Sequence, residues 1–151
     1  ITGYFVQPTP EEKELWDNTA DPEFFEKVKV AIQNREVPEA MKHMGEDYLY
    51  YPISKTFTQY YTRANTMRFG RKGCQIFSIA PGAFDTPMLR ESSAEVIAGI
   101  AKGTTAGRLG DPDEMADFIA HLLAPGHDYL TGCDLILDGG KFGLTTAKQI
   151  D

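Results

Sequence analysis

Two short apolar runs separated by helical sequence most constrain how this chain can fold. The first, CQIFSIAPG at residues 74–82, ends in Pro81-Gly82, and the second, CDLILDGG at residues 133–140, ends in two glycines. Apolar runs without polar alternation are typical of strands that are buried on both faces, and hence of parallel sheets. Parallel strands need a crossover connection, so the helical sequence between the two runs predicts an α/β fold.

Helical patterns fill most of the remaining sequence. Apolar residues recur at helical spacing from Asp47 to Gly70, and further helices are expected at residues 92–103 and 111–126. Asp111 is the expected cap of the last helix, with Pro112 at its first position. Because two strands cannot form a sheet with a core of their own, we predict the C-terminal part of a doubly wound parallel, Rossmann-type sheet.

An acidic, helix-prone segment at residues 9–46 precedes this pattern. Thr9 with Pro10, and Asp21 with Pro22, are expected to begin two helices, and residues 37–47 could form a third. The segment is either a solvated helical region or an insertion that flanks a substrate cleft. The chain begins with ITGYF, which resembles the exit of a strand, so we expect the N-terminal half of the same domain to be missing.

The net charge and the two cysteines limit which partners, compartments and metal sites fit this chain. The net charge of −7 disfavours nucleic acids and anionic membranes as partners, because both favour basic patches. No apolar run approaches the roughly 18 residues of a membrane span, and no signal peptide is visible. Cys74 and Cys133 lie in apolar runs without metal-ligand spacing, so we expect buried free thiols, a reducing cytoplasmic location and no metal.

The segment YYPISK at residues 50–55 contains the strongest candidate for chemistry. Tyr51 and Lys55 are four residues apart at the start of a predicted helix, so their side chains share one face. A free tyrosine, with a pKa of about 10, is a poor base at neutral pH, but a nearby ammonium stabilises the tyrosinate. Such a pair can exchange a proton with a carbonyl or alcohol oxygen. In isolation, the same spacing is usually only a solvated surface contact.

Four motifs occur in order: YPISK, SIAPGAFDTPM, GRLGDPDEMA and YLTGCDLILDGG. Over about residues 47–142 this order resembles the C-terminal half of the short-chain dehydrogenase/reductase family. The resemblance implies an oxidoreductase that uses NAD or NADP to interconvert a ketone and a secondary alcohol. It implies that Tyr51 is the catalytic acid/base and also contacts the cofactor. Lys55 would lower the tyrosine's pKa and bind the nicotinamide ribose.

The resemblance also implies contacts for the nicotinamide at the end of the first strand. Pro81 and Gly82 match the turn beside the ring, which is where parallel sheets bind ligands. The backbone of Phe84 would meet the carboxamide, and the Thr86 hydroxyl would bind the carboxamide or the phosphates. Arg108, in GRLG, looks like one of the family's structural positions, as does the aspartate of LDGG.

Candidates for an apolar substrate pocket are Tyr50, Phe84, Met88 and Leu89, with Trp16 as a further candidate from the insertion side, and they suggest a bulky substrate such as a steroid. Residues 1–151 would then form the C-terminal part of a single domain, with a helical insertion at 9–46 and a catalytic and oligomerisation region at 47–142. Some 3α-hydroxysteroid dehydrogenases and carbonyl reductases of the family carry such an insertion. We expect the small-molecule substrate, the missing N-terminal half and further copies in a dimer or tetramer as partners.

The chain also departs from the family's pattern. The glycine-rich Gly-x-x-x-Gly-x-Gly turn is absent, Pro38 takes the place of the catalytic serine, and residues 1–50 contain no serine. One alternative is therefore an inactive fragment, or half of a nicked reductase that binds no cofactor alone. Another is an enoyl-thioester reductase, a branch of the family that uses a Tyr and Lys seven residues apart, as Tyr48 and Lys55 are here.

Overall fold

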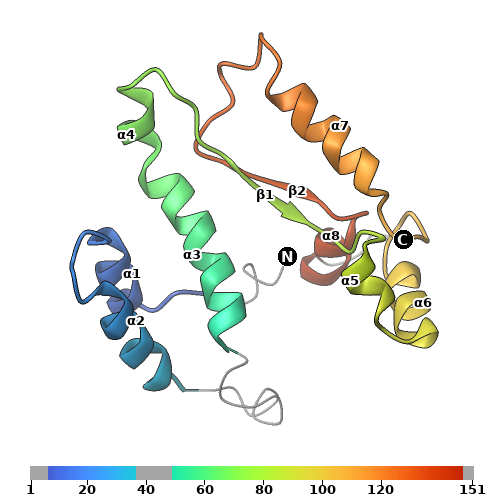
Figure 1. Cartoon of the computed structure of the whole chain (residues 1–151), viewed down its shortest axis with the longest axis horizontal. Helices are drawn as coiled ribbons and strands as arrows, with labels where there is room; N and C mark the ends of the chain where they lie inside the picture. Colours follow the sequence, from blue (N-terminus) through green and yellow to red (C-terminus); the bar gives the residue numbers. More distant parts are fainter. Residues whose placement is uncertain (1–6, 37–48, 148–151) are drawn as a thin grey trace. The chain divides into compact units, whose positions relative to one another are not determined.

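The computed structural model, which describes residues 7–36 and 49–147, confirms the α/β class (Figure 1). The chain divides into two compact units between Cys74 and Gln75. We call the part up to Cys74 the N-terminal unit and the part from Gln75 the C-terminal unit. The organisation of residues 1–151 as part of one larger domain stays a prediction.

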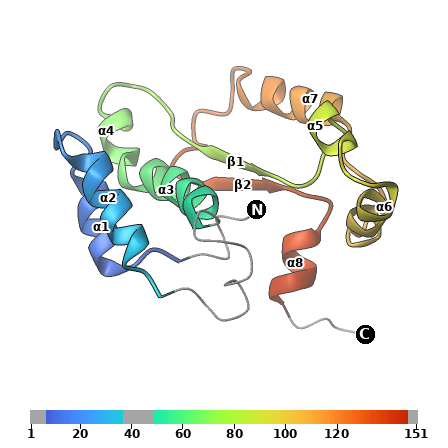
Figure 2. The ribbon, with the colours of Figure 1, turned by 60° about the horizontal axis from the view of Figure 1, so that its bottom comes forward.

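The described residues of the N-terminal unit form helices only. These are α1 (Pro10–Asp17), α2 (Phe24–Gln33), α3 (Tyr50–Ala64) and α4 (Thr66–Gly70). Helices α1, α2 and α3 pack against one another (Figure 2). Their shared core consists of Trp16, Phe24, Ile32, Leu49 and Ile53.

The predicted start of α1 is confirmed. The Thr9 hydroxyl accepts a hydrogen bond from the Glu12 backbone, and the Glu12 carboxylate accepts one from the Thr9 backbone. Glu12 is only 1% exposed, and both of its carboxylate oxygens bind Nη1 of Arg35, at 3.0 and 2.9 Å. The cap of α1 therefore also ties this helix to the residue that follows α2.

The predicted cap of α2 is wrong in position. The helix begins at Phe24, and the Asp21 carboxylate accepts instead from the Glu23 backbone and from Lys27 Nζ. Residues 37–47, where a third helix was expected, lie outside the described residues.

The helix expected from Asp47 to Gly70 is interrupted at Asn65, and the part of it before Leu49 lies outside the described residues. The Asn65 amide donates to the Tyr61 carbonyl, and the Thr66 hydroxyl donates to the Arg63 carbonyl. Side-chain bonds of this kind compete with the backbone ladder. Helix α3 ends there, and α4 continues for five residues.

The C-terminal unit contains a parallel pair of strands, β1 (Ser78–Pro81) and β2 (Asp134–Leu137), in register from Ser78 with Asp134 to Pro81 with Leu137. Between the strands lie α5 (Pro87–Arg90), α6 (Ala94–Lys102) and α7 (Pro112–Leu122), and α8 (Lys141–Thr146) follows β2. Helix α7 lies alongside the strands (Figures 1 and 2). Its predicted cap is confirmed, since Asp111 and Glu114 form a capping box.

Strand β1 is shorter than predicted because the residues before it bond elsewhere. The Gln75 amide donates to the carbonyls of His127 and Leu130, and the Ile76 backbone donates to the Thr131 hydroxyl. These bonds hold the chain beside the loop that precedes β2, and the regular ladder begins only at Ser78.

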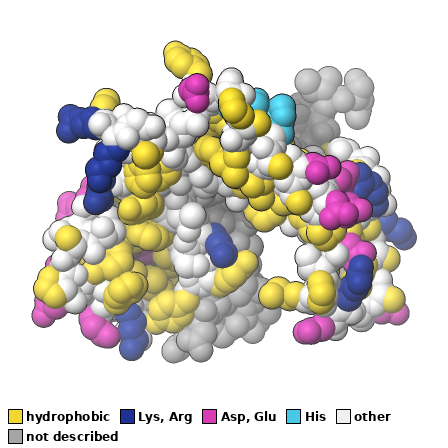
Figure 3. Space-filling model, turned by 45° about the horizontal axis from the view of Figure 1, so that its top comes forward, with side chains coloured by type: hydrophobic (Ala, Val, Ile, Leu, Met, Phe, Trp, Pro, Cys, Tyr) yellow, Lys and Arg dark blue, Asp and Glu magenta, His cyan; other side chains and the backbone are white. Residues whose placement is uncertain are grey.

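The expectation that both strands are buried on both faces is wrong for the described residues. Pro81 is exposed and Ile136 is 36% exposed. Figure 3 shows hydrophobic side chains on the visible face among acidic and basic ones. Both cysteines are free, as predicted, but Cys74 is exposed rather than buried. None of the described helices is both long enough and apolar enough to span a membrane.

Candidate active site

Tyr51 and Lys55 lie one turn apart on the exposed side of α3. Nζ of Lys55 lies 5.0 Å from the centroid of the Tyr51 ring, which is a cation–π contact. Tyr51 is 61% exposed, so the phenol is open to a molecule from outside the N-terminal unit. The predicted pairing along one helix face is therefore present in the structure.

Buried neighbours in the same turns of α3 fix this arrangement. Pro52, Ile53 and Thr56, which lie roughly 100–200° around the helix from Tyr51, are buried. Pro52 also suits the first turn of a helix, where a missing backbone N–H is tolerated. Burial of one side leaves Tyr51 and Lys55 facing outward.

At the end of β1, the predicted turn brings two backbone segments into close contact. The Gly82 backbone donates to the Leu137 carbonyl at 2.8 Å. A side chain at Gly82 would place its Cβ 2.6 Å from Cα of Asp138, so only glycine fits. The turn after Pro81 thus lies directly against the end of β2.

Phe84 joins this turn to the segment before α7. Phe84 and Gly110 form an isolated parallel bridge, and the phenyl ring covers Gly110 so closely that a Cβ there would lie 2.6 Å from it. Bonds from Gly110 to the Ala83 carbonyl and from Asp85 to the Gly110 carbonyl flank the bridge. Phe84 is therefore held from both sides.

The hydroxyl of Thr86 has a structural partner that the sequence analysis did not foresee. It caps α5 by accepting a hydrogen bond from the Leu89 backbone. An ion pair from Arg90 to Asp85 closes this short helix onto its own start. Met88 is 82% exposed and Leu89 is half-buried, and their contact with a substrate stays a prediction.

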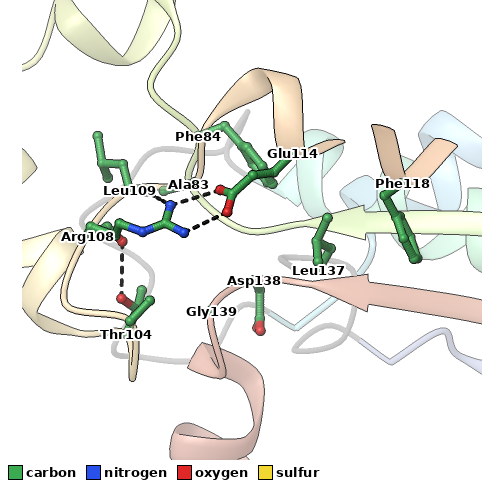
Figure 4. A pocket seen from close by; sticks show the side chains of 12 residues that line it. Ala83, Phe84, Thr104, Arg108, Leu109, Glu114, Phe118, Leu137, Asp138 and Gly139 are labelled. Carbon is green, nitrogen blue, oxygen red and sulfur yellow. Dashed lines mark hydrogen bonds and ion pairs between the residues drawn. The ribbon is translucent and has the colours of Figure 1, made fainter. Parts of the chain in front are cut away.

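A cavity of about 280 Å³ lies between the end of β2 and the start of α7 (Figure 4). Inside it, the Arg108 guanidinium binds both carboxylate oxygens of Glu114, at 2.8 and 2.6 Å. This guanidinium, with a further bond from the Asp111 backbone, lowers the pKa of Glu114 to about 2. Asp138 accepts from the backbone of Gly140 and of Phe142 at the start of α8. These bonds give Arg108 and Asp138 structural roles.

The structure thus brings the predicted residues together as two groups, one in each unit. Tyr50, Tyr51 and Lys55 belong to the N-terminal unit, and the candidates from Pro81 to Leu89 belong to the C-terminal unit. Tyr48 and Pro38 lie outside the described residues. Within residues 7–36 and 49–147, no three His, Cys, Asp or Glu side chains lie together as metal ligands.

Two residues that line an apolar cavity beside Tyr50 were not among the predicted site residues. They are Phe25 and Lys29 of α2, and they line this cavity together with Trp16 of α1, which was a candidate. The signal available in the sequence was the apolar side of α2, where Phe24, Val28 and Ile32 recur at helical spacing.

A family model described as enoyl-(acyl carrier protein) reductase matches residues 39–141. Among curated proteins, a short-chain dehydrogenase/reductase of Alternaria brassicicola is 35% identical over 94 residues, covering 60% of this chain and 34% of the relative. The 3-alpha-hydroxysteroid dehydrogenase/carbonyl reductase of Comamonas testosteroni is 35% identical over 105 residues, covering 66% of this chain and 41% of the relative. The chain therefore spans about a third to two fifths of these relatives.

Solved structures show the same partial coverage. A short-chain dehydrogenase/reductase from Serratia marcescens has a TM-score of 0.58 and 28% identity, covering 70% of this chain and 40% of that one. A variant of actinorhodin polyketide ketoreductase with NADPH has a TM-score of 0.55 and 29% identity, covering 60% and 39%. A 4-hydroxyisoleucine dehydrogenase with NADH has a TM-score of 0.58 and 26% identity, covering 65% and 40%.

Proposed function

Because the chain belongs to the short-chain dehydrogenase/reductase family and corresponds to the C-terminal portion of its members, we propose that it carries the acid/base pair of an NAD(P)-dependent oxidoreductase. The reaction interconverts a ketone and a secondary alcohol. The observation that carries the proposal is the pairing of Tyr51 with Lys55, whose ammonium lies 5.0 Å from the phenol ring on an exposed helix side.

In this reaction Tyr51 exchanges a proton with the substrate oxygen. During reduction the phenol donates its proton to the carbonyl oxygen, and during oxidation the phenolate takes the proton of the alcohol. The positive charge of Lys55 stabilises the phenolate form. The nicotinamide, when bound, supplies or takes up the hydride.

The surface at the end of β1 fits the flat nicotinamide ring of such a cofactor. An open cavity of about 480 Å³ there is lined by Pro81, Gly82, Phe84 and Thr86 together with apolar residues of α7. A flat ring suits a wall of this kind, which combines strand-end backbone with apolar side chains. The sequence contains no glycine-rich turn for the phosphates. We therefore propose that another segment or chain supplies a dinucleotide-binding half, which holds the phosphates.

The substrate class follows from the apolar candidates Tyr50, Phe84, Met88 and Leu89, which suit a bulky ketone such as a steroid. The match to a 3-alpha-hydroxysteroid dehydrogenase/carbonyl reductase supports this choice. We further propose that the enzyme works in the cytoplasm as a homodimer or homotetramer. Analytical ultracentrifugation of the purified protein would contradict this assembly by showing a single copy at micromolar concentration.

A second candidate, the enoyl-thioester reductase, is favoured by the description of the matching family model. It would use Tyr48 and Lys55 to reduce a carbon–carbon double bond. Oxidation of NADH and NADPH should be followed with a panel of bulky ketones and with enoyl thioesters. Our proposal is supported if the enzyme reduces ketones and the Tyr48→Phe variant still does so. The enoyl-thioester reductase replaces it if the enzyme reduces only thioesters and Tyr48→Phe abolishes that activity.

The remaining alternative is an inactive fragment. The intact masses of all chains in protein purified from its native source would decide this. A dinucleotide-binding segment on the same or a companion chain supports the enzyme. A sample without such a segment and without nicotinamide binding contradicts it.

A further inference from the structure

The N-terminal unit contains an open apolar cavity of about 320 Å³ between α1, α2 and α3. Cavities that bind small molecules begin at about this size. The described residues that line it are Trp16, Phe24, Phe25, Val28, Lys29, Ile32, Tyr50, Ile53, Ser54 and Phe57. Tyr51 and Lys55 are not among them, so the cavity faces a different side of α3 from the acid/base pair.

Aromatic side chains make up half of the described wall residues, and the rings of Trp16, Phe24, Phe25 and Phe57 pack on one another. The Phe57 ring lies 5.4 Å from that of Trp16 and 6.0 Å from that of Phe24, between ring centroids. Trp16, Phe24 and Ile53 are buried members of the core, so this part of the wall is fixed before any ligand arrives. Phe25, which is 81% exposed, stands against Phe24 at the mouth.

One positively charged side chain lies at the rim of the cavity. Lys29 is the one charged side chain among the described residues of the wall, and no acid is among them. Lys27 on the same helix pairs with Asp21 and Glu23 at 2.7 and 3.1 Å, whereas no ion pair of the described residues involves Lys29. The Lys29 ammonium is therefore available to a ligand.

We propose that this cavity is a second small-molecule site, which binds a compact apolar ring system carrying one anionic group such as a carboxylate. The ring system lies against Phe24, Phe57 and Trp16, and the anionic group lies toward Lys29. This site goes beyond the proposed reaction and does not depend on it. Among the substrate-pocket candidates, Tyr50 and Trp16 line this cavity, so the site reassigns both and leaves Phe84, Met88 and Leu89 as they are.

The test uses Trp16, the only tryptophan of the chain, as a reporter within the wall. Adamantane carboxylate and the neutral adamantane methanol have the same ring body and do not absorb where tryptophan does. Titration of the full protein with each should give a saturable change in Trp16 fluorescence. The carboxylate should bind about two- to fivefold more tightly, as expected for a partly exposed ion pair.

Matched variants separate the two parts of the proposal. Lys29→Gln should abolish the preference for the carboxylate, while Lys13→Gln, at an exposed lysine of α1 outside the wall, should leave it unchanged. Phe25→Ala should weaken both ligands about three- to tenfold with an unchanged circular dichroism spectrum, because Phe25 is largely exposed. Tyr51→Phe should bind both ligands like the wild type, whatever its effect on catalysis.

Three results would overturn the proposal. They are the absence of a saturable signal at millimolar ligand, equal binding of the acid and the alcohol, and unchanged binding in Phe25→Ala. None of these results bears on ketone reduction, so this site and the proposed reaction stand or fall separately.

Discussion

Replacing Gly82 by alanine should loosen the junction between the two strands. The new Cβ would lie 2.6 Å from Cα of Asp138 and 2.9 Å from its Cβ, about 0.8 Å closer than ordinary contact allows. The first of these atoms belongs to the backbone, so a rotamer change cannot relieve the clash. The end of β2 must move away, and the bond from Gly82 to the Leu137 carbonyl, now 2.8 Å, must lengthen.

The cost of Gly82→Ala follows from these two effects. Overpacking of a fixed contact costs about 1–3 kcal/mol, and the weakened backbone bond adds up to about 1 kcal/mol. The free energy of unfolding should therefore fall by about 1–4 kcal/mol, which lowers the thermal midpoint by roughly 2–16 °C. Urea unfolding followed by circular dichroism measures the change directly.

Gly99→Ala is the matched control. Gly99 lies inside α6 with no atom within 4 Å of an added Cβ. Alanine there should raise stability by about 0.5–1 kcal/mol through helix propensity. The reasoning is refuted if Gly82→Ala unfolds at the wild-type urea concentration with an unchanged slope.

Three further changes test other parts of the account. Lys55→Met should slow ketone reduction at neutral pH by about 10²-fold, because the tyrosinate loses its neighbouring cation; a rate within twofold of wild type would remove Lys55 from the chemistry. Glu12→Ala should cost about 3–5 kcal/mol in urea unfolding, because it leaves Arg35 without its buried partner; a cost below 1 kcal/mol would mean that water replaces the pair. Since the pKa of Glu114 is lowered from 4.5 to about 2 beside Arg108, the stability from this pair is full above about pH 4.5 and is lost as the pH falls toward 2. Urea midpoints between these pH values should fall more steeply for the wild type than for Glu114→Gln, and equal slopes would contradict this.

Much of the secondary structure could be predicted because its signals are local. Thr9 and Asp111, each followed by a proline and by an acid three residues on, were expected to begin helices, and each does so with a capping box. The two apolar runs also gave the correct parallel pairing. These features depend on bonds between residues only a few positions apart, or on the hydrophobicity of one short run.

The features that escaped prediction depend on distant residues. Strand β1 starts late because Gln75 bonds to carbonyls more than fifty positions away. The partner of buried Glu12 is Arg35, 23 positions on. No pattern along the chain marks either pair, because both exist only once the fold brings the residues together.

The candidate site shows the same division. The spacing of Tyr51 and Lys55 along a helix was enough to place them on one face. The cap that Thr86 gives to α5 has the same local Thr-Pro signal as Thr9 and Pro10, so it could have been predicted. The ring of Phe84 over Gly110 joins residues that are distant in the sequence, and no local pattern marks it.

The most direct test of the central claim is the rate of NAD(P)H-dependent ketone reduction by the complete protein with Tyr51→Phe. Tyr61→Phe, on the same helix but outside the proposed site, is the control for loss of a phenol hydroxyl. The account predicts a fall in kcat of about 10²–10⁴-fold for Tyr51→Phe, with Tyr61→Phe close to the wild type. Retention of most of the ketone-reducing activity by Tyr51→Phe would contradict it.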